Sequence, residues 1–191
     1  MNFDNIHRWL VLVPHRDSLE PIQELKRRLW QAGMGGVKLL PSLAFIAPVE
    51  EPAKPEHLKA LARLIREKSI EQDRAAYIDG GTLDLFSLPG GLVALAFPLI
   101  PQISDTLFAA SAHTYGKLAP YQGPSPLFIL ALHADSNTLV LAQKLQQELP
   151  PFRFRQGAVA NYAFTYTGGE DAAAIRIRWE LGKPYWMAHH G

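Results

Sequence analysis

The chain has no cysteine among its 191 residues. It therefore has no disulfide, no thiolate nucleophile and no thiolate zinc ligand, and the absence fits a reducing compartment. No apolar run reaches the roughly 18 to 20 residues that a membrane-spanning helix needs, and Met1 to Arg8 lacks the apolar stretch of a signal peptide. The net charge is only +1, so contact with nucleic acid would need a local cluster of arginine and lysine. We expect a cytoplasmic protein without membrane attachment.

The sequence does have the composition of a globular protein. Apolar residues make up 48% and charged residues 19%, which excludes a disordered chain, and the length suits one domain over residues 1–191. Apolar runs predict strands at 9–13, 37–47, 82–88, 92–97, 127–133, 152–155, 158–167 and 175–181. Helical spacing predicts helices at 19–32, 55–70, 105–116 and 138–149. The expected N-caps are Ser18, Ser104 and either Ser136 or Asn137.

Two segments share a layout. The stretches PSLAFIAPVEEPAKPEHLKALARLI and PLFILALHADSNTLVLAQKLQQELP each give a proline, an apolar strand, an acidic turn and a capped helix. They lie about 85 residues apart, as repeats of one unit would. One interpretation is a pair of pseudo-symmetric lobes whose strands face each other across a cleft. The other is that any α+β protein contains several such units.

The layout resembles that of the 2H phosphoesterase superfamily, which includes 2'-5' RNA ligase-like proteins and cyclic phosphodiesterases. The resemblance rests on the order of elements, the opening RWLVLVP strand with its amphipathic helix, and the two proline-led strands. It implies an α+β fold of two lobes, each an antiparallel sheet with outer helices, around a central cleft. It also implies a His-x-Thr/Ser motif in each lobe, whose two histidines serve as general acid and base on a cyclic phosphodiester.

Neither motif is present. Ser42 stands where the first motif has histidine and Ala44 where it has threonine, and Leu127 and Ile129 replace the second pair. Because side chains alternate along a strand, we expect these four positions to face the cleft, with His133 at the far end of the second strand. Ser42 is interpreted as a remnant, since a serine without a base is a poor nucleophile.

Three other residues are candidates for a ligand or catalytic site. His133 stands two residues before Asp135, whose carboxylate could hold an imidazole protonated. The alternative is that both residues simply begin the turn and cap of the next helix. His113 and Tyr115 precede a Pro/Gly-rich loop expected at the rim of the cleft. No histidines show metal-ligand spacing on a recognisable element, so we expect no metal and no cofactor.

Two arginine pairs alternate with apolar residues near the C-terminus. They are Arg153 with Arg155, and Arg176 with Arg178. If their strands are neighbours, four guanidinium groups share one surface that would suit phosphate oxygens and stacked bases. The alternative is an ordinary solvated sheet face.

These observations lead to a primary functional hypothesis and two alternatives. The first is a catalytically degenerate 2H phosphoesterase-like protein that binds a nucleotide- or RNA-like phosphate ligand or acts as an interaction module. The second is an active cyclic phosphodiesterase or RNA-processing hydrolase whose site has moved to residues such as His133, His113, Tyr115 and the arginines. The third is an unrelated domain that binds a protein partner.

Overall fold

The computed structural model of the chain describes residues 6–33, 37–71, 77–88, 91–119, 126–167 and 176–186. Within these ranges lie a short 3-10 turn, η1 (Arg16–Ser18), and four helices: α1 (Glu20–Gln31), α2 (Pro55–Glu71), α3 (Pro101–Tyr115) and α4 (Ser136–Gln147). The described strands are β1 (Ile6–Pro14), β2 (Lys38–Leu39), β3 (Ala44–Pro48), β4 (Tyr77–Asp79), β5 (Asp84–Leu88), β6 (Leu92–Pro98), β7 (Leu127–Leu132), β8 (Arg153–Thr167), β9 (Arg176–Leu181) and β10 (Tyr185–Trp186). The expected α+β class is confirmed.

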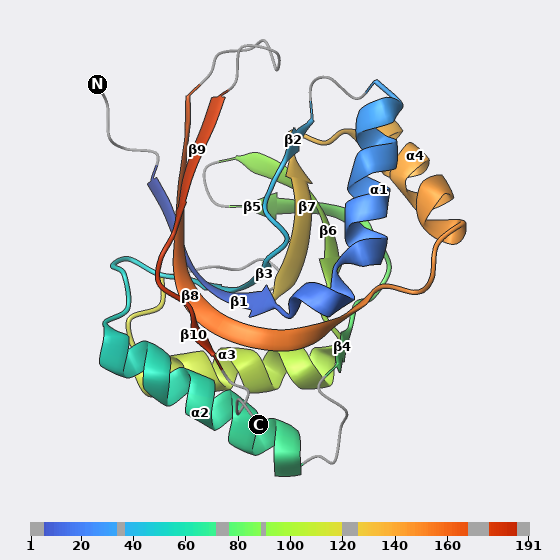
Figure 1. Ribbon diagram of the computed structural model, residues 1–191. Coiled ribbons are helices and arrows are strands. Elements are labelled where there is room, and N and C mark those ends of the chain that lie inside the picture. The colour runs from blue at the N-terminus through green and yellow to red at the C-terminus, as the bar shows by residue number, and fades with distance from the viewer. Residues whose placement is uncertain are drawn as a thin grey trace.

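The described strands form one antiparallel sheet with the order β10-β8-β1-β3-β7-β6-β5. Strand β2 lies beside β7, and both β4 and β9 lie beside β8. In Figure 1, β8 sweeps from β9 round the lower part of the molecule, so the sheet is strongly bent. The centre of the sheet is the β3–β7 pair, in which Phe45 is opposite Leu127. The two strands that were expected to face each other across a cleft are therefore paired directly, and the strands of the two expected lobes are joined in one sheet.

The helices cover one face of the sheet in two pairs. Figure 1 shows α2 beside α3 below the sheet and α1 beside α4 at its right. Helix α1 illustrates why they dock there: Ile22, Leu25 and Leu29 recur at helical spacing and are all buried. These side chains join a helix-side cluster that also takes in residues of β1, β3, β6, β7 and β8. None of the described helices is long and apolar enough to span a membrane.

The opposite face of the sheet is concave and is packed by strand residues without any described helix. We call this packing the inner apolar cluster. It is made of Trp9, Val11, Leu40, Leu43, Phe45, Leu88, Leu92, Ala94, Ala96, Leu127, Ile129, Leu132, Ala160, Tyr162 and Phe164. Because the sheet bends round this face, its own strands supply the apolar surface that a second layer would otherwise provide.

The helix starts differ from those expected. The Ser18 hydroxyl donates to the His15 carbonyl oxygen (2.8 Å) and accepts from the Arg155 N–H (2.9 Å), so Leu19 is the N-cap of α1. Helix α3 starts at Pro101, which leaves Ser104 inside it. Helix α4 is capped by Asp135 and not by either residue expected. Caps that bond to distant backbone cannot be read from local sequence.

Two strand boundaries also differ. The strand expected over 37–47 is split into β2 and β3, and the strands expected over 152–155 and 158–167 are a single strand, β8. Continuity through Gly157 depends on its lack of a side chain, because a Cβ atom there would lie 2.5 Å from the Val13 carbonyl oxygen. The pairing of β1 with β8 shifts register at this point, between Val13 and Pro14.

Candidate functional site

The four positions of the missing motifs divide between the two faces of the sheet. Leu127 and Ile129 lie in the inner apolar cluster, as expected. Ala44 belongs to the helix-side cluster, and Ser42 lies against α1, where its hydroxyl oxygen accepts a hydrogen bond from Lys26. The prediction that Ser42 and Ala44 face the cleft is therefore wrong. Leu43 and Phe45 take the inner positions instead, because β3 begins only at Ala44 and its alternation points Phe45 inward.

The centre of the concave face is filled by aromatic rings. Phe45 is fully buried and meets Trp9 and Tyr162 edge-on, with ring centroids 5.5 and 5.4 Å apart. Such edge-to-face contacts are the favoured geometry for aromatic pairs in a core. The second pair of motif positions, Leu127 and Ile129, thus lies in apolar packing around these rings.

Polar groups reappear at the edge of this packing. His7 on β1 stacks on Phe164 (4.8 Å between centroids) and lies 5.9 Å from the Tyr166 ring. His133, which follows β7, lies 6.0 Å from the same ring. Trp179 on β9 is opposite Phe164, is 55% exposed and stacks on a buried tyrosine of β8. We call His7, His133, Tyr166, Trp179 and Lys38 the mouth of the concave face.

The surroundings of the two imidazoles of the mouth favour their neutral forms. Burial lowers the pKa of His7, and burial together with the Lys38 ammonium lowers the pKa of His133. The Nε2 atoms of both rings are buried and have no hydrogen-bond partner. The same is true of the Tyr162 hydroxyl. A buried polar atom left without a partner costs about 1–3 kcal/mol. A ligand that offered polar atoms to this mouth would recover part of that cost.

His133 has a further peculiarity in its backbone. Its φ angle is 59°, and it is the one non-glycine residue in the described chain with a left-handed conformation. Residues held in such sparsely populated conformations cluster at functional sites. Asp135, which was a candidate partner for the imidazole, instead accepts hydrogen bonds from the Thr138 N–H and hydroxyl, both at 2.7 Å. The carboxylate therefore caps α4, and the pKa of His133 is lowered where an ion pair would raise it.

His113 and Tyr115 lie on α3, on the helix side of the sheet. His113 is exposed beside a shallow apolar groove between α2 and α3 that also involves Leu64. The Tyr115 hydroxyl donates to the Glu51 carbonyl oxygen (2.6 Å), and its ring packs against His57. The structure does not bring either residue together with His133.

The two arginine pairs are also separate. Arg153 and Arg155 lie in the part of β8 that pairs with β4, where Arg153 contacts Asp79 (3.2 Å) and covers the Tyr77 ring. Arg178 of β9 is instead opposite Thr165, some ten residues and about 33 Å further along the extended strand. The four guanidinium groups thus do not form one surface. Arg176 and Arg178 alternate with Trp179 along β9 and so lie on the outer face of the sheet, away from the mouth.

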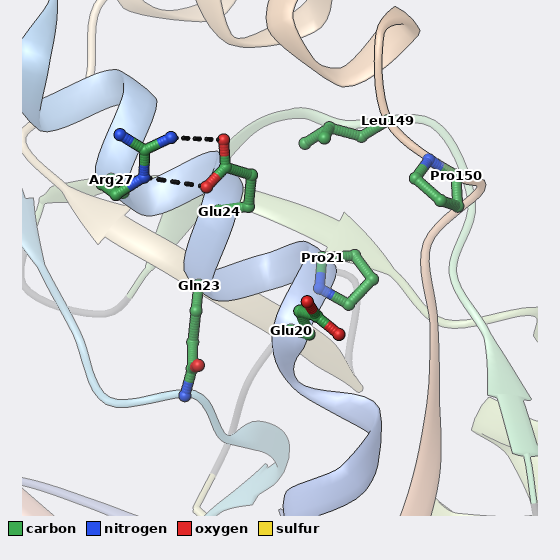
Figure 2. Close-up of a pocket in the computed structure, with 7 residues that line it drawn as sticks. All are labelled: Glu20, Pro21, Gln23, Glu24, Arg27, Leu149 and Pro150. Atoms are coloured by element: carbon green, nitrogen blue, oxygen red, sulfur yellow. Dashed lines mark hydrogen bonds and ion pairs between the residues drawn. The ribbon is translucent and has the colours of Figure 1, made fainter.

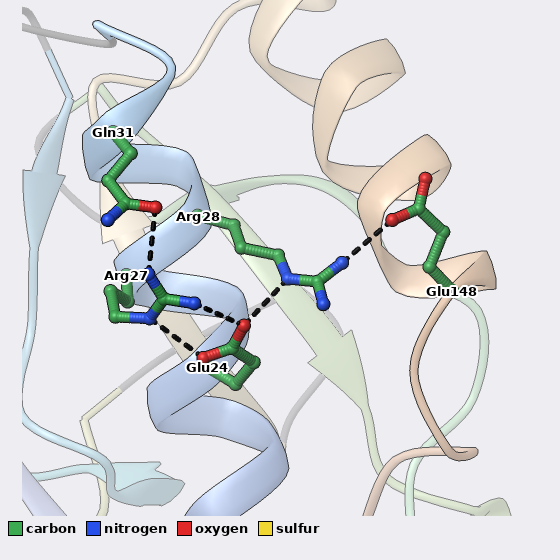
Figure 3. A network of polar contacts seen from close by, with 5 residues as sticks. All are labelled: Glu24, Arg27, Arg28, Gln31 and Glu148. Atoms are coloured by element: carbon green, nitrogen blue, oxygen red, sulfur yellow. Dashed lines mark hydrogen bonds and ion pairs between the residues drawn. The ribbon is translucent and has the colours of Figure 1, made fainter.

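One groove on the described surface contains charged side chains that bind each other. This groove of about 470 Å³ lies between α1 and the turn after α4 and is lined by Glu20, Glu24, Arg27 and Pro150, among others. Figure 2 shows that Glu24 and Arg27, the charged pair of this groove, bind each other. Figure 3 shows the same carboxylate also holding Arg28, which reaches across to Glu148 of α4 at 2.7 Å. This network joins two helices and pairs the Glu24 and Arg27 charges of the groove with each other.

Two residues of interest were not singled out from the sequence. His7 shares a strand face with Trp9 and Val11, at spacings of two, and that alternation is the signal that places it beside the inner apolar cluster. Lys26 follows Ile22 by four residues and precedes Leu29 by three, which sets it at the buried margin of α1. Within the described residues, no three histidine, aspartate or glutamate side chains gather as metal ligands.

The chain matches no protein-family model and no curated protein. Among solved structures it is similar to E. coli LigT in its apo form, with 15% identity, a TM-score of 0.44 and coverage of 95% of this chain and 97% of that chain. It is also similar to Kluyveromyces marxianus Usb1, with 10% identity, a TM-score of 0.42 and coverage of 91% and 97%. The same Usb1 with uridine monophosphate gives 11% identity, a TM-score of 0.41 and the same coverage.

Proposed function

We propose that the chain is a catalytically degenerate 2H phosphoesterase-like protein that binds a nucleotide- or RNA-like phosphate ligand at the mouth of the concave face. The observation that carries the proposal is the convergence of two neutral imidazoles, each with a buried Nε2 atom lacking a partner, on the ring of Tyr166. The packed inner apolar cluster below supports a degenerate site, because the motif positions Leu127 and Ile129 are buried within it.

The other groups of the mouth match the parts of a nucleotide. Trp179 offers an indole that is more than half exposed and is already oriented by stacking on Tyr162. An aromatic platform of this kind contributes about 1–3 kcal/mol for each base that stacks on it. Lys38 supplies a cation within electrostatic reach of His133, and a phosphate oxygen would interact with it favourably. The neutral imidazoles can each donate or accept a hydrogen bond at a base edge or sugar hydroxyl.

A second candidate function is an active phosphodiesterase with a relocated site. Its support is the same pair, because two neutral imidazoles with pKa values below 6.5 retain the capacity to take up protons. This candidate would use His7 with His133. It would not use His113 or Tyr115, which lie on the helix side.

The test is phosphorus NMR of a nucleoside 2',3'-cyclic monophosphate in excess over the protein, because one spectrum reports both binding and turnover. The variants are Trp179→Ala and His133→Ala, and the matched control is Trp30→Ala, which removes another exposed indole, on α1. We expect line broadening without conversion. Trp179→Ala should weaken binding roughly 5- to 150-fold, the equivalent of one lost stacking contact, and the control should not.

Each other outcome has a definite meaning. Conversion to a monophosphate that His133→Ala abolishes would replace the binding proposal with the phosphodiesterase candidate. Equal weakening by Trp179→Ala and Trp30→Ala would remove the mouth as the binding site. An unchanged spectrum with the unmodified protein would reject cyclic nucleotides as ligands and favour the hypothesis of a protein partner.

A further inference from the structure

A second constellation lies on the other side of the segment that leads into β3. Lys26 extends from α1, and its Nζ atom donates to the Leu40 carbonyl oxygen (2.5 Å) and to the Ser42 hydroxyl oxygen (2.9 Å). The Leu40 and Leu43 side chains point into the inner apolar cluster, whereas Ser42 lies against α1. The pair of Lys26 and Ser42 therefore forms no part of the mouth, and its chemistry is independent of the proposed function.

Lys26 is an unusual lysine in its surroundings. Burial lowers its pKa from 10.5 to about 8. In the described part of the chain it has no carboxylate within ion-pair distance. A lysine with a pKa near 8 is neutral in roughly a tenth of the molecules at pH 7 and in half of them at pH 8. It is thus able to serve as a base near neutral pH.

The hydrogen bonds show how that base would be directed. A neutral amine retains two N–H donors and gains a lone pair. One donor keeps its bond to the Leu40 carbonyl oxygen, which fixes the position of the nitrogen. The lone pair then faces the Ser42 hydroxyl at hydrogen-bonding distance and accepts its proton. This is the arrangement in which a serine hydroxyl becomes a nucleophile.

We propose that Ser42 and Lys26 form a nucleophilic pair that takes an acyl group from an activated acyl donor, such as an aryl ester. In the step, the Ser42 Oγ atom forms a bond to the carbonyl carbon of the donor. The bond from that carbon to the leaving oxygen breaks, and the leaving group departs as its anion. The hydroxyl proton of Ser42 passes to the Nζ atom of Lys26. The products are therefore an acyl-serine, an ammonium group and the released alkoxide or phenolate. The released anion takes up a proton from water according to its own pKa.

The same segment limits the speed of any turnover. The amide that follows a nucleophile commonly stabilises the oxyanion, but the Leu43 N–H is bonded to the Pro41 carbonyl oxygen (2.9 Å). Both steps lack that donor, but the aryl ester has a good leaving group whereas the acyl-serine is an unactivated alkyl ester, so its hydrolysis is expected to be the slow step. The pair should therefore behave as a site of stoichiometric acylation.

The experiment uses p-nitrophenyl acetate with the full chain and records released p-nitrophenolate, followed by peptide mass mapping of the acetyl group. The variants are Ser42→Ala, Lys26→Met and Lys26→Arg, and the matched control is Ser136→Ala, which removes an exposed serine at the start of α4. We expect one acetyl group on Ser42, formed at a rate that rises with pH, is half-maximal near pH 8 and levels off about one pH unit above that. Ser42→Ala should abolish it, and both lysine variants should slow it by about 10²-fold or more, the usual contribution of a general base.

Folding of each variant is checked by circular dichroism. Lys26→Arg keeps a cation at the site but cannot be deprotonated, so equal acylation rates in Lys26→Arg and the unmodified protein would overturn the proposal. So would an acetyl group mapped to Lys26 in place of Ser42, because the lysine would then be the nucleophile. Acetylation of Ser136 in the unmodified protein as fast as that of Ser42 would show general hydroxyl reactivity and would equally reject the pair.

Discussion

Replacing Phe45 with alanine tests whether the concave face is a core or a cleft. The ring is fully buried and lies between Trp9 and Tyr162. A buried aromatic side chain removes about 150–250 Å² from water, which at about 25 cal/mol per Å² corresponds to roughly 4–6 kcal/mol as an upper bound. Measured costs of replacing buried phenylalanine by alanine are about 3–5 kcal/mol. We therefore expect Phe45→Ala to lower the free energy of unfolding by about 3–5 kcal/mol, a large part of the 5–15 kcal/mol typical of a domain.

The assay is urea denaturation followed by circular dichroism, with the slope of the transition compared between proteins so that a change in the denatured state is recognised. The matched control is Phe108→Ala on α3, where the ring is 41% exposed and the expected loss is within about 0.5 kcal/mol. A loss below about 1 kcal/mol for Phe45→Ala would refute the reasoning, because the ring would then border open space and the concave face would be a ligand cleft.

Two further predictions concern polar groups at the edge of this core. Tyr162→Phe removes a buried hydroxyl that has no hydrogen-bond partner, so it should leave stability unchanged or raise it by about 1–3 kcal/mol; destabilisation in the same urea assay would mean that the hydroxyl is bonded. His7 has a folded-state pKa below its ordinary 6.5 because of burial, so the unfolded state binds protons more readily, and stability present above pH 6.5 is lost as the pH falls through the lower folded value. His7→Phe should flatten this decline below pH 6.5, and an unaltered decline in thermal melts recorded from pH 6.5 downward would contradict the assignment.

The features that the sequence predicts well are those written in local patterns. The helix expected over 55–70 is α2, Pro55–Glu71, and the hairpin expected from the PGG turn is β5 with β6. In both cases the signal is periodicity or turn chemistry within a few residues. Such patterns predict the folded structure well because the residues on which they depend lie close together in the sequence.

The features that the sequence does not predict depend on distant partners. Ser18 looks like a helix cap, but its hydroxyl is bonded to the backbone of Arg155, well over a hundred residues away. The register that points Phe45 inward and Ala44 outward follows from where β3 begins, which is set by the turn after Pro41 and the pairing with β7. A shift of one residue exchanges the two faces of a strand, and that shift moved Ser42 and Ala44 from the expected cleft to the helix side.

The candidate site was predicted in part for the same reason. His133 could be chosen because it ends an apolar strand that the sequence marks clearly. His7, the second imidazole of the mouth, could not be chosen from the sequence. Only the long-range pairing of β1 with β8 sets it against Phe164 and near Tyr166. The contact of Lys26 with Ser42 likewise requires α1 to dock beside the segment before β3, which is a matter of tertiary packing.

The pairing of β1 with β8 also determines how long β1 must wait for its partner strand during synthesis. Residues 6–14 find their partners at residues 156–165, so roughly 150 residues must be synthesised in between, which takes about 8 to 30 s at ordinary elongation rates. During that interval β1 can pair with β3 but has one open edge, and the apolar side chains of Trp9 and Val11 lack the cover that Ala160 and Tyr162 later provide. An open apolar edge is a template for aggregation. Early ribosome-bound intermediates of this protein are therefore the stage at which chaperone binding should be strongest.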